Sequence, residues 1–244
     1  MKRRATFCRV ALASLLALAP ACRSPDADAE RAARAGRWEE SLERFRVLAA
    51  EHPGEDRYQT RVLELCEQRA RDAESRGDWS RALALWMESV DQARSFARPV
   101  DVARFESDLN LCHARHVAAQ QARGDAVGAY EALLAWQTAF PQERELRRLE
   151  LDLRGPAVLA LEARLVDAVR AGEWTAAADA CRLFDRIDPR HRAALQYRKR
   201  VWERVLELSR SVGNLEAADE AARKLIRFDP SHSAAREFLE RGEK

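Results

Sequence analysis

Glycine and long apolar runs are scarce in this chain of 244 residues, which has nine glycines. No stretch alternates apolar and polar residues for long enough to predict a β-sheet. Charged residues make up 34% of the chain and hydrophobic residues 47%, a composition typical of a largely helical protein. The sequence also lacks a glycine-rich phosphate loop and a G-x-S-x-G elbow. We therefore expect an all-α protein that is not an enzyme and has neither a cofactor nor a small-molecule substrate.

Five glycines recur in one pattern. Each is followed five residues later by a small residue, and in four cases a proline stands seventeen residues after the glycine. The glycine–small pairs are Gly36/Ser41, Gly77/Ala82, Gly124/Ala129, Gly172/Ala177 and Gly213/Ala218, and the prolines are Pro53, Pro141, Pro189 and Pro230. Positions nine and twelve after each glycine share a helical face with the small residue. Each unit predicts a tight turn, a closely packed helix and a proline stop.

This pattern resembles the tetratricopeptide repeat (TPR), whose second helix runs from a glycine turn through a small residue to a proline. Residues 33–45 are similar to that motif, with serine in place of the usual alanine. Residues 174–194 and 215–235 are identical at 10 of 21 aligned positions. The resemblance implies a right-handed helical-hairpin solenoid of about five repeats. A generic helical bundle with similar turns is the alternative.

The spacing of the five glycines departs from that family. Successive glycines lie 41, 47, 48 and 41 residues apart, whereas the TPR period is 34 residues. The excess equals roughly two or four helical turns, so we interpret it as lengthened first helices over 56–76, 100–123 and 191–212. In the remaining linker, Gly155-Pro156 predicts that a short helix over 143–153 ends and another begins. Residues 231–240 predict a cap helix.

The N-terminus has the features of an export signal. A basic start, residues 1–4, precedes an apolar run over 10–19 that is too short to span a bilayer. Cys22 follows Leu18-Ala19-Pro20-Ala21, which resembles the bacterial lipobox and implies cleavage before Cys22 and acylation of its thiol and amine. Ordinary cleavage after Ala21, leaving a free Cys22, is the alternative. We predict a signal peptide over 1–21, a polar tether over 22–30 and the repeat array over 31–244.

Location and charge follow from this assignment. Several acyl chains would anchor the protein firmly in a membrane, since one chain alone binds weakly. Arg23 is not the aspartate that marks inner-membrane retention in enteric bacteria, so we expect the periplasmic face of a bacterial outer membrane. Loss of residues 1–21 removes four basic residues and no acidic ones, which changes the formal charge from +2 to −2. The composition therefore gives no support for nucleic-acid binding.

Three cysteines and several histidines remain in the predicted mature chain. Cys181 falls at a repeat core position and is expected to be buried. A disulfide between Cys66 and Cys112 is left open, although neighbouring helix axes usually stand 8–10 Å apart. Cys112 and His116 share a helical face and could begin a zinc site, but no further ligands stand out and we predict no metal. The repeat-equivalent histidines, His191 and His232, are expected to be structural.

Tryptophan and charge have structural interpretations as well. Trp38, Trp79 and Trp174 stand two residues after a repeat glycine, and Trp86 and Trp136 fall on the packing face. Packing explains this placement better than a ligand cage does. The charged run over 142–150 predicts a solvated helix face linked by i, i+4 ion pairs.

Two functions are consistent with these features. The first is a membrane-tethered, non-enzymatic scaffold that binds a peptide or protein partner on the concave face lined by its first helices, as the family resemblance implies. The second is a fixed subunit of an outer-membrane assembly or secretion machine, because lipidated five-repeat proteins of this size resemble the assembly lipoprotein of the barrel-insertion complex. The long first helices fit that family less well.

Overall fold

The computed structural model describes residues 25–242, and this part of the chain contains eleven α-helices and no strand, which confirms the all-α class. The signal peptide predicted over 1–21 and the proposed acylation site, Cys22, lie outside the described residues. The helices are α2 (Pro25–Arg34), α3 (Trp38–Glu51), α4 (Asp56–Ser75), α5 (Trp79–Ser95), α6 (Pro99–Ala122), α7 (Ala126–Ala139), α8 (Glu145–Ala171), α9 (Trp174–Ile187), α10 (Arg192–Ser211), α11 (Leu215–Phe228) and α12 (Ser233–Gly242).

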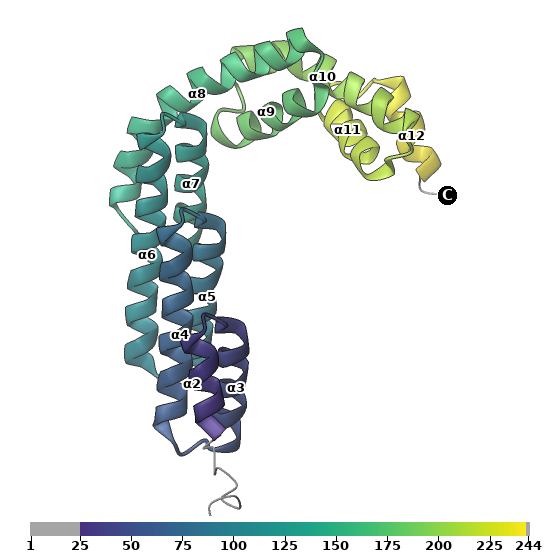
Figure 1. Cartoon of the computed structure of the whole chain (residues 1–244). Coiled ribbons are helices and arrows are strands. Elements are labelled where there is room, and N and C mark those ends of the chain that lie inside the picture. Colours follow the sequence, from purple (N-terminus) through teal and green to yellow (C-terminus); the bar gives the residue numbers. More distant parts are fainter. Residues whose placement is uncertain (1–24, 243–244) are drawn as a thin grey trace, which may run out of the picture. The chain divides into compact units, whose positions relative to one another are not determined.

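The helices form two compact units, one reaching to Cys112 and one beginning at His113. In the first unit α2 packs on α3, α3 on α4 and α4 on α5. In the second unit each helix from α7 to α12 packs on the next, and α8 also contacts α10. Figure 1 shows these neighbours side by side within each unit. No helix among residues 25–242 combines the length and apolar character needed to cross a bilayer.

The five repeat glycines make the turns that the sequence predicts. Their φ angles lie between +71° and +74°, in the left-handed region that side chains with a Cβ avoid. A helix begins two residues after each of them: α3, α5, α7, α9 and α11, which we call the second helices. Asp78, Asp125 and Asn214 cap three of these helices by accepting a hydrogen bond from a backbone N–H of the first turn. Local chemistry therefore sets where each second helix starts.

The packing face of the second helices is also as predicted. All five small residues, Ser41, Ala82, Ala129, Ala177 and Ala218, have no exposed surface. The residues nine and twelve positions after each glycine are buried in every unit: Phe45, Trp86, Leu133, Cys181, Ala222, Leu48, Ser89, Trp136, Phe184 and Leu225. A small side chain at the centre of such a face lets two helices approach closely, and the larger ones around it fill the core. One register thus recurs in all five hairpins.

Proline ends four of the second helices, and the first helices are long. Helices α3, α7, α9 and α11 each stop two residues before their proline, since proline disfavours helix in the residue before it. Helix α5 lacks this proline and ends instead at a turn in which Ala97 adopts a φ of +54°. The predicted long helices are confirmed within one residue as α4, α6 and α10, with 20, 24 and 20 residues. The predicted cap helix is α12.

Two sequence predictions differ from the structure. The predicted break at Gly155-Pro156 is wrong, because α8, which is 27 residues long, continues through Pro156. Leu153, Ala157, Leu161 and Leu165 are buried on both sides of the proline, and the burial of this face offsets the helical hydrogen bond that proline removes. Helix α2 also begins at Pro25 and buries Ala29 completely. Residues 25–30, assigned to a polar tether, are therefore part of the first hairpin.

Substitution of Gly213 by alanine should destabilise the second unit by about 1 kcal/mol. A Cβ at Gly213 would meet no atom within 4 Å, so the cost comes from the left-handed backbone alone. Gly54→Ala is the matched control, since a Cβ there also meets open space and the backbone has no left-handed φ. Urea unfolding of both variants measures the difference. Equal stabilities for the two variants would contradict the turn assignment.

Candidate interaction surface

The solvent side of the long first helices is the surface on which the sequence places a partner. Three of these helices, α6, α8 and α10, each expose two large apolar side chains: Val100 and Leu111, Leu151 and Leu159, and Leu195 and Leu208. Single exposed apolar residues are normal on a protein surface. Two on one face of a helix, as Leu151 and Leu159 are in α8, are more informative, because together they offer area that a partner can bury.

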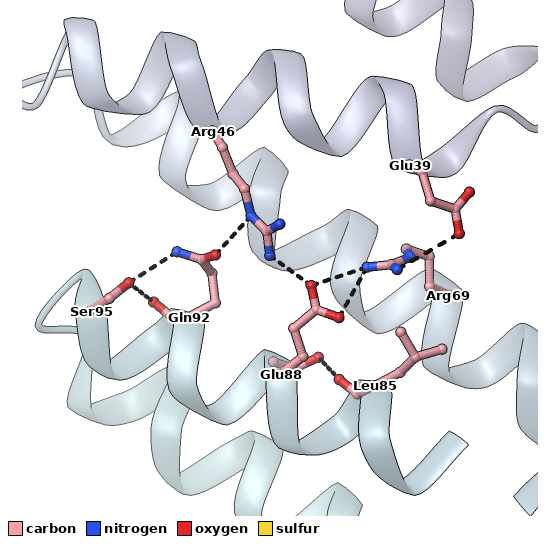
Figure 2. Close-up of polar contacts among 8 residues, drawn as sticks. Glu39, Arg46, Arg69, Leu85, Glu88, Gln92 and Ser95 are labelled. Atoms are coloured by element: carbon pink, nitrogen blue, oxygen red, sulfur yellow. Dashed lines mark hydrogen bonds and ion pairs between the residues drawn. The ribbon is translucent and has the colours of Figure 1, made fainter. Parts of the chain in front are cut away.

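A polar network links three helices of the first unit, α3, α4 and α5. Glu88 of α5 accepts hydrogen bonds from two arginines, Arg46 of α3 at 2.6 Å and Arg69 of α4 at 3.2 Å to each carboxylate oxygen. Arg46 also donates to Gln92 at 3.0 Å, and Arg69 lies 3.7 Å from Glu39. Figure 2 shows the two guanidinium groups converging on the one carboxylate. The network joins three helices of two hairpins.

The positions of these charges favour a structural role. The Arg69 side chain is only 13% exposed, and a carboxylate held by two arginines satisfies charges that would be costly to bury alone. The cluster therefore holds α3 and α5 together rather than presenting a nucleophile or a general base.

The second unit contains a corresponding link between second helices. Arg182 of α9 donates to both carboxylate oxygens of Glu220 in α11, at 2.8 and 2.5 Å, and these hydrogen bonds lower the pKa of Glu220. Asp185 of α9 lies 2.8 Å from a guanidinium nitrogen of Arg198 and accepts a hydrogen bond from Lys224 at 2.7 Å. Arg46 and Arg182 both stand ten residues after their glycine. Both join one second helix to the next.

Sequence reasoning missed the first-helix members of these networks, Arg69 and Arg198. Arg198 is 4% exposed, and its guanidinium group lies 4.6 Å from the ring centre of Phe228. Arg69 and Arg198 stand at different distances from the repeat glycines. The repeat pattern therefore does not predict that either of them is buried. Only the arginines at the tenth position after a glycine could have been found from the sequence.

The tryptophans pack in the core or against their neighbours, which is the interpretation that the sequence favours. Trp86 and Trp202 are at most 2% exposed, and Trp136 is also buried. Trp174 is half-buried at the start of α9, with Arg200 and Arg204 about equally far from its ring, at 5.6 and 6.0 Å. The Trp174 ring is therefore engaged by cations of the chain itself.

The candidate ligands Cys112 and His116 are not part of a larger group of histidine, cysteine and acidic side chains among the described residues. His113 is buried between Trp136 and Phe140, with ring centres 6.5 and 6.0 Å away, while His116 on the same helix contacts Gln120. Cys66, Cys112 and Cys181 are buried thiols, and no disulfide joins Cys66 to Cys112. Burial raises the pKa of Cys66 and of Cys181 to about 11. Among residues 25–242, no three histidine, cysteine or acidic side chains gather in a metal-binding group.

The repeat-equivalent histidines stabilise the starts of their helices. His191 precedes α10 and stacks on Phe184 with ring centres 4.9 Å apart. His232 precedes α12, and its Nδ1 accepts a hydrogen bond from the backbone N–H of Ala235 at 3.3 Å. These contacts agree with the structural role that their recurrence predicts.

No family model matches this chain, and no curated protein matches it significantly. Its function is therefore inferred from its own contacts and exposed faces.

Proposed function

We propose that this protein is an exported, membrane-tethered, TPR-like solenoid that acts as a non-enzymatic scaffold for a peptide or protein partner. The observation that carries the proposal is the single register of the five hairpins, in which the glycine turn and three packing positions recur without exception. Stacked hairpins of one register bury a continuous core and leave an extended surface for binding. The long first helices provide the most variable part of that surface.

The described charges support binding rather than catalysis. The buried and half-buried arginines and carboxylates of these networks are paired with one another in links between helices, so they contribute to stability. The exposed apolar side chains of α6, α8 and α10 do not take part in these links between helices. A scaffold requires accessible apolar anchors of this kind.

Purification of the full chain from detergent-solubilised bacterial membranes tests the scaffold proposal. We expect a protein or peptide client that leaves at high salt or with competing peptide. Stoichiometric recovery of barrel-assembly or secretion subunits would instead identify a fixed machine component. Turnover of a small molecule by the purified chain would contradict the proposal.

The tether has its own prediction. Mass spectrometry of the mature protein should find Cys22 at the N-terminus with a lipid mass on it, and Cys22→Ala should move the protein from the membrane to the soluble fraction. Acyl chains supply the membrane affinity, at about 0.8 kcal/mol for each buried methylene. Cys66→Ala is the matched control, because Cys66 is buried within the first unit and should not affect membrane association. An unmodified Cys22 would exclude the anchor.

A further inference from the structure

The solvent face of the first half of α8 exposes two leucines in one row. Leu151 is 77% exposed and Leu159 is 69% exposed, and Gly155 stands between them. Residues four positions apart in a helix lie on the same face, so the three form a strip about 12 Å long. The opposite side of α8 packs on the core through Leu153, Leu161 and other buried residues.

Arginines surround the more exposed leucine. The neighbours of Leu151 on the helix surface, three and four residues away, are Arg147, Arg148, Arg154 and Gly155. The guanidinium groups of Arg147 and Arg148 form no hydrogen bond or ion pair with the described residues, and both residues are exposed. The nearest acid on that side, Glu150, instead binds Tyr130 and Gln137. The other acids of this segment, Glu145 and Asp152, stand three residues before and four residues after Arg148 and therefore lie on its side of the helix, without an ion pair to it.

Gly155 flattens the strip at its centre. A Cβ at this position would meet no atom of the chain within 4 Å, so the space above it is open to solvent. A glycine between two exposed leucines allows another backbone to approach α8 closely at that point. The strip is thus a shallow saddle with a leucine at each end.

We propose that this α8 face, made of Arg147, Arg148, Leu151, Gly155 and Leu159, binds an acidic amphipathic helix of the partner protein. The proposal rests on the scaffold function and specifies the chemistry of its client. An apolar residue of the partner helix lies over Gly155 and covers the two leucines, while its carboxylates pair with Arg147 and Arg148. Charge-assisted pairs of this kind fix orientation and register, and the covered leucines supply the affinity.

The shape of the α8 face favours a helix over a lipid surface. Helices that lie in a membrane interface insert a broad apolar face into the acyl region. The α8 face is one residue wide and offers two leucines, one at each side of a glycine. A single row of this width matches the narrow a/d seam of a helix of the coiled-coil type.

A synthetic peptide of three heptads tests the charge requirement. It carries leucine at a and d and glutamate at e and g, and its analogue carries lysine in place of glutamate. The full chain should bind the glutamate peptide at least about tenfold more tightly than the lysine peptide, and higher salt should weaken this binding. Equal binding of the two peptides would overturn the proposal, as would tighter binding to anionic phosphatidylglycerol vesicles than to the glutamate peptide.

Charge-reversal variants locate the binding face. Arg147→Glu with Arg148→Glu should reverse the preference, so that the lysine peptide binds more tightly, and Leu151→Gln should weaken both peptides about tenfold. Arg236→Glu and Leu215→Gln are matched controls, because both residues are exposed on other helices and Leu215 is 68% exposed. All five substitutions are at the surface and should leave folding intact. An unchanged preference in the arginine variant would overturn the assignment to α8.

Photocrosslinking in cells separates this proposal from the scaffold function. A photoreactive residue at position 155 should capture an acidic helical segment of a partner, and one at position 215 should not. Capture of a partner only from photoreactive residues in other first helices would overturn the α8 assignment but would not contradict the scaffold proposal. Absence of protein capture from every first helix would overturn both.

Discussion

Replacement of Trp202 by alanine should lower the free energy of unfolding of the second unit by about 3–5 kcal/mol. Trp202 of α10 has no exposed surface, and it belongs to the core that extends from Val117 to Ala235. Its indole N–H makes no hydrogen bond with the described residues, so the loss reflects packing together with the contacts of the ring with Arg182 and Lys224, at 5.4 and 5.9 Å. The cavity that remains cannot collapse fully, because long helices on both sides hold their positions. Thermal or urea unfolding measures the change.

The matched control is Trp174→Ala in the same unit. Trp174 is half-buried at the helix start, and its contacts with Arg200 and Arg204 lie on the surface side. We expect a loss of about 1 kcal/mol for this variant. A loss as large as that of Trp202→Ala would show that the helix-start tryptophans carry the core. A negligible loss at Trp202 would contradict its burial.

The second helices could be predicted from the sequence because their signals are local. A glycine with a left-handed φ, a capping residue such as Asp125 and a proline each act within a few residues of their position. The same glycine fixes the phase of the helical face, so burial of Ala177 and of Phe184 followed from counting. The lengths of α4, α6 and α10 followed from the spacing between successive turns, once the length of each second helix was subtracted.

The course of α8 depended on contacts that lie far away in the sequence. Gly155-Pro156 is a local signal to stop, and burial of Ala157 and Leu161 against other helices outweighs it. The buried arginines are similar, since the burial of Arg198 depends on Asp185 and Phe228 of two other helices. Local patterns could not report these contacts.

The candidate α8 face was visible in the sequence only in part. The charged run over 142–150 predicted a solvated surface laced by ion pairs, and the surface is indeed solvated. The ion pairs are wrong for Arg147 and Arg148, which pair with no acid of the described chain. For Arg147, the acid three residues later, Glu150, is engaged instead by Tyr130 and Gln137 of α7. Competition of this kind between helices is one factor that leaves a charge unpaired.

Acidification should destabilise the second unit through His113. Burial, with a smaller contribution from the charge of His116, lowers the pKa of His113 to about 4, whereas an unfolded histidine titrates near 6.5. Between these values the unfolded chain binds a proton that the folded chain excludes, so stability falls as the pH falls from about 6.5 to about 4. The full difference amounts to about 3 kcal/mol. Above pH 6.5 the group has no effect on stability.

The variant His113→Leu isolates this contribution. Nδ1 of His113 has no hydrogen-bond partner in the described structure, so leucine loses no polar contact there and keeps the apolar contact with Trp136. Carboxylates such as Glu220, whose pKa is lowered in the fold, add their own acid sensitivity to both proteins and cancel in the comparison. The variant should therefore lose about 3 kcal/mol less than the parent between pH 6.5 and 4. His52→Gln, at an exposed site, should keep the parental profile, and parallel profiles for all three proteins would place the proton acceptor elsewhere.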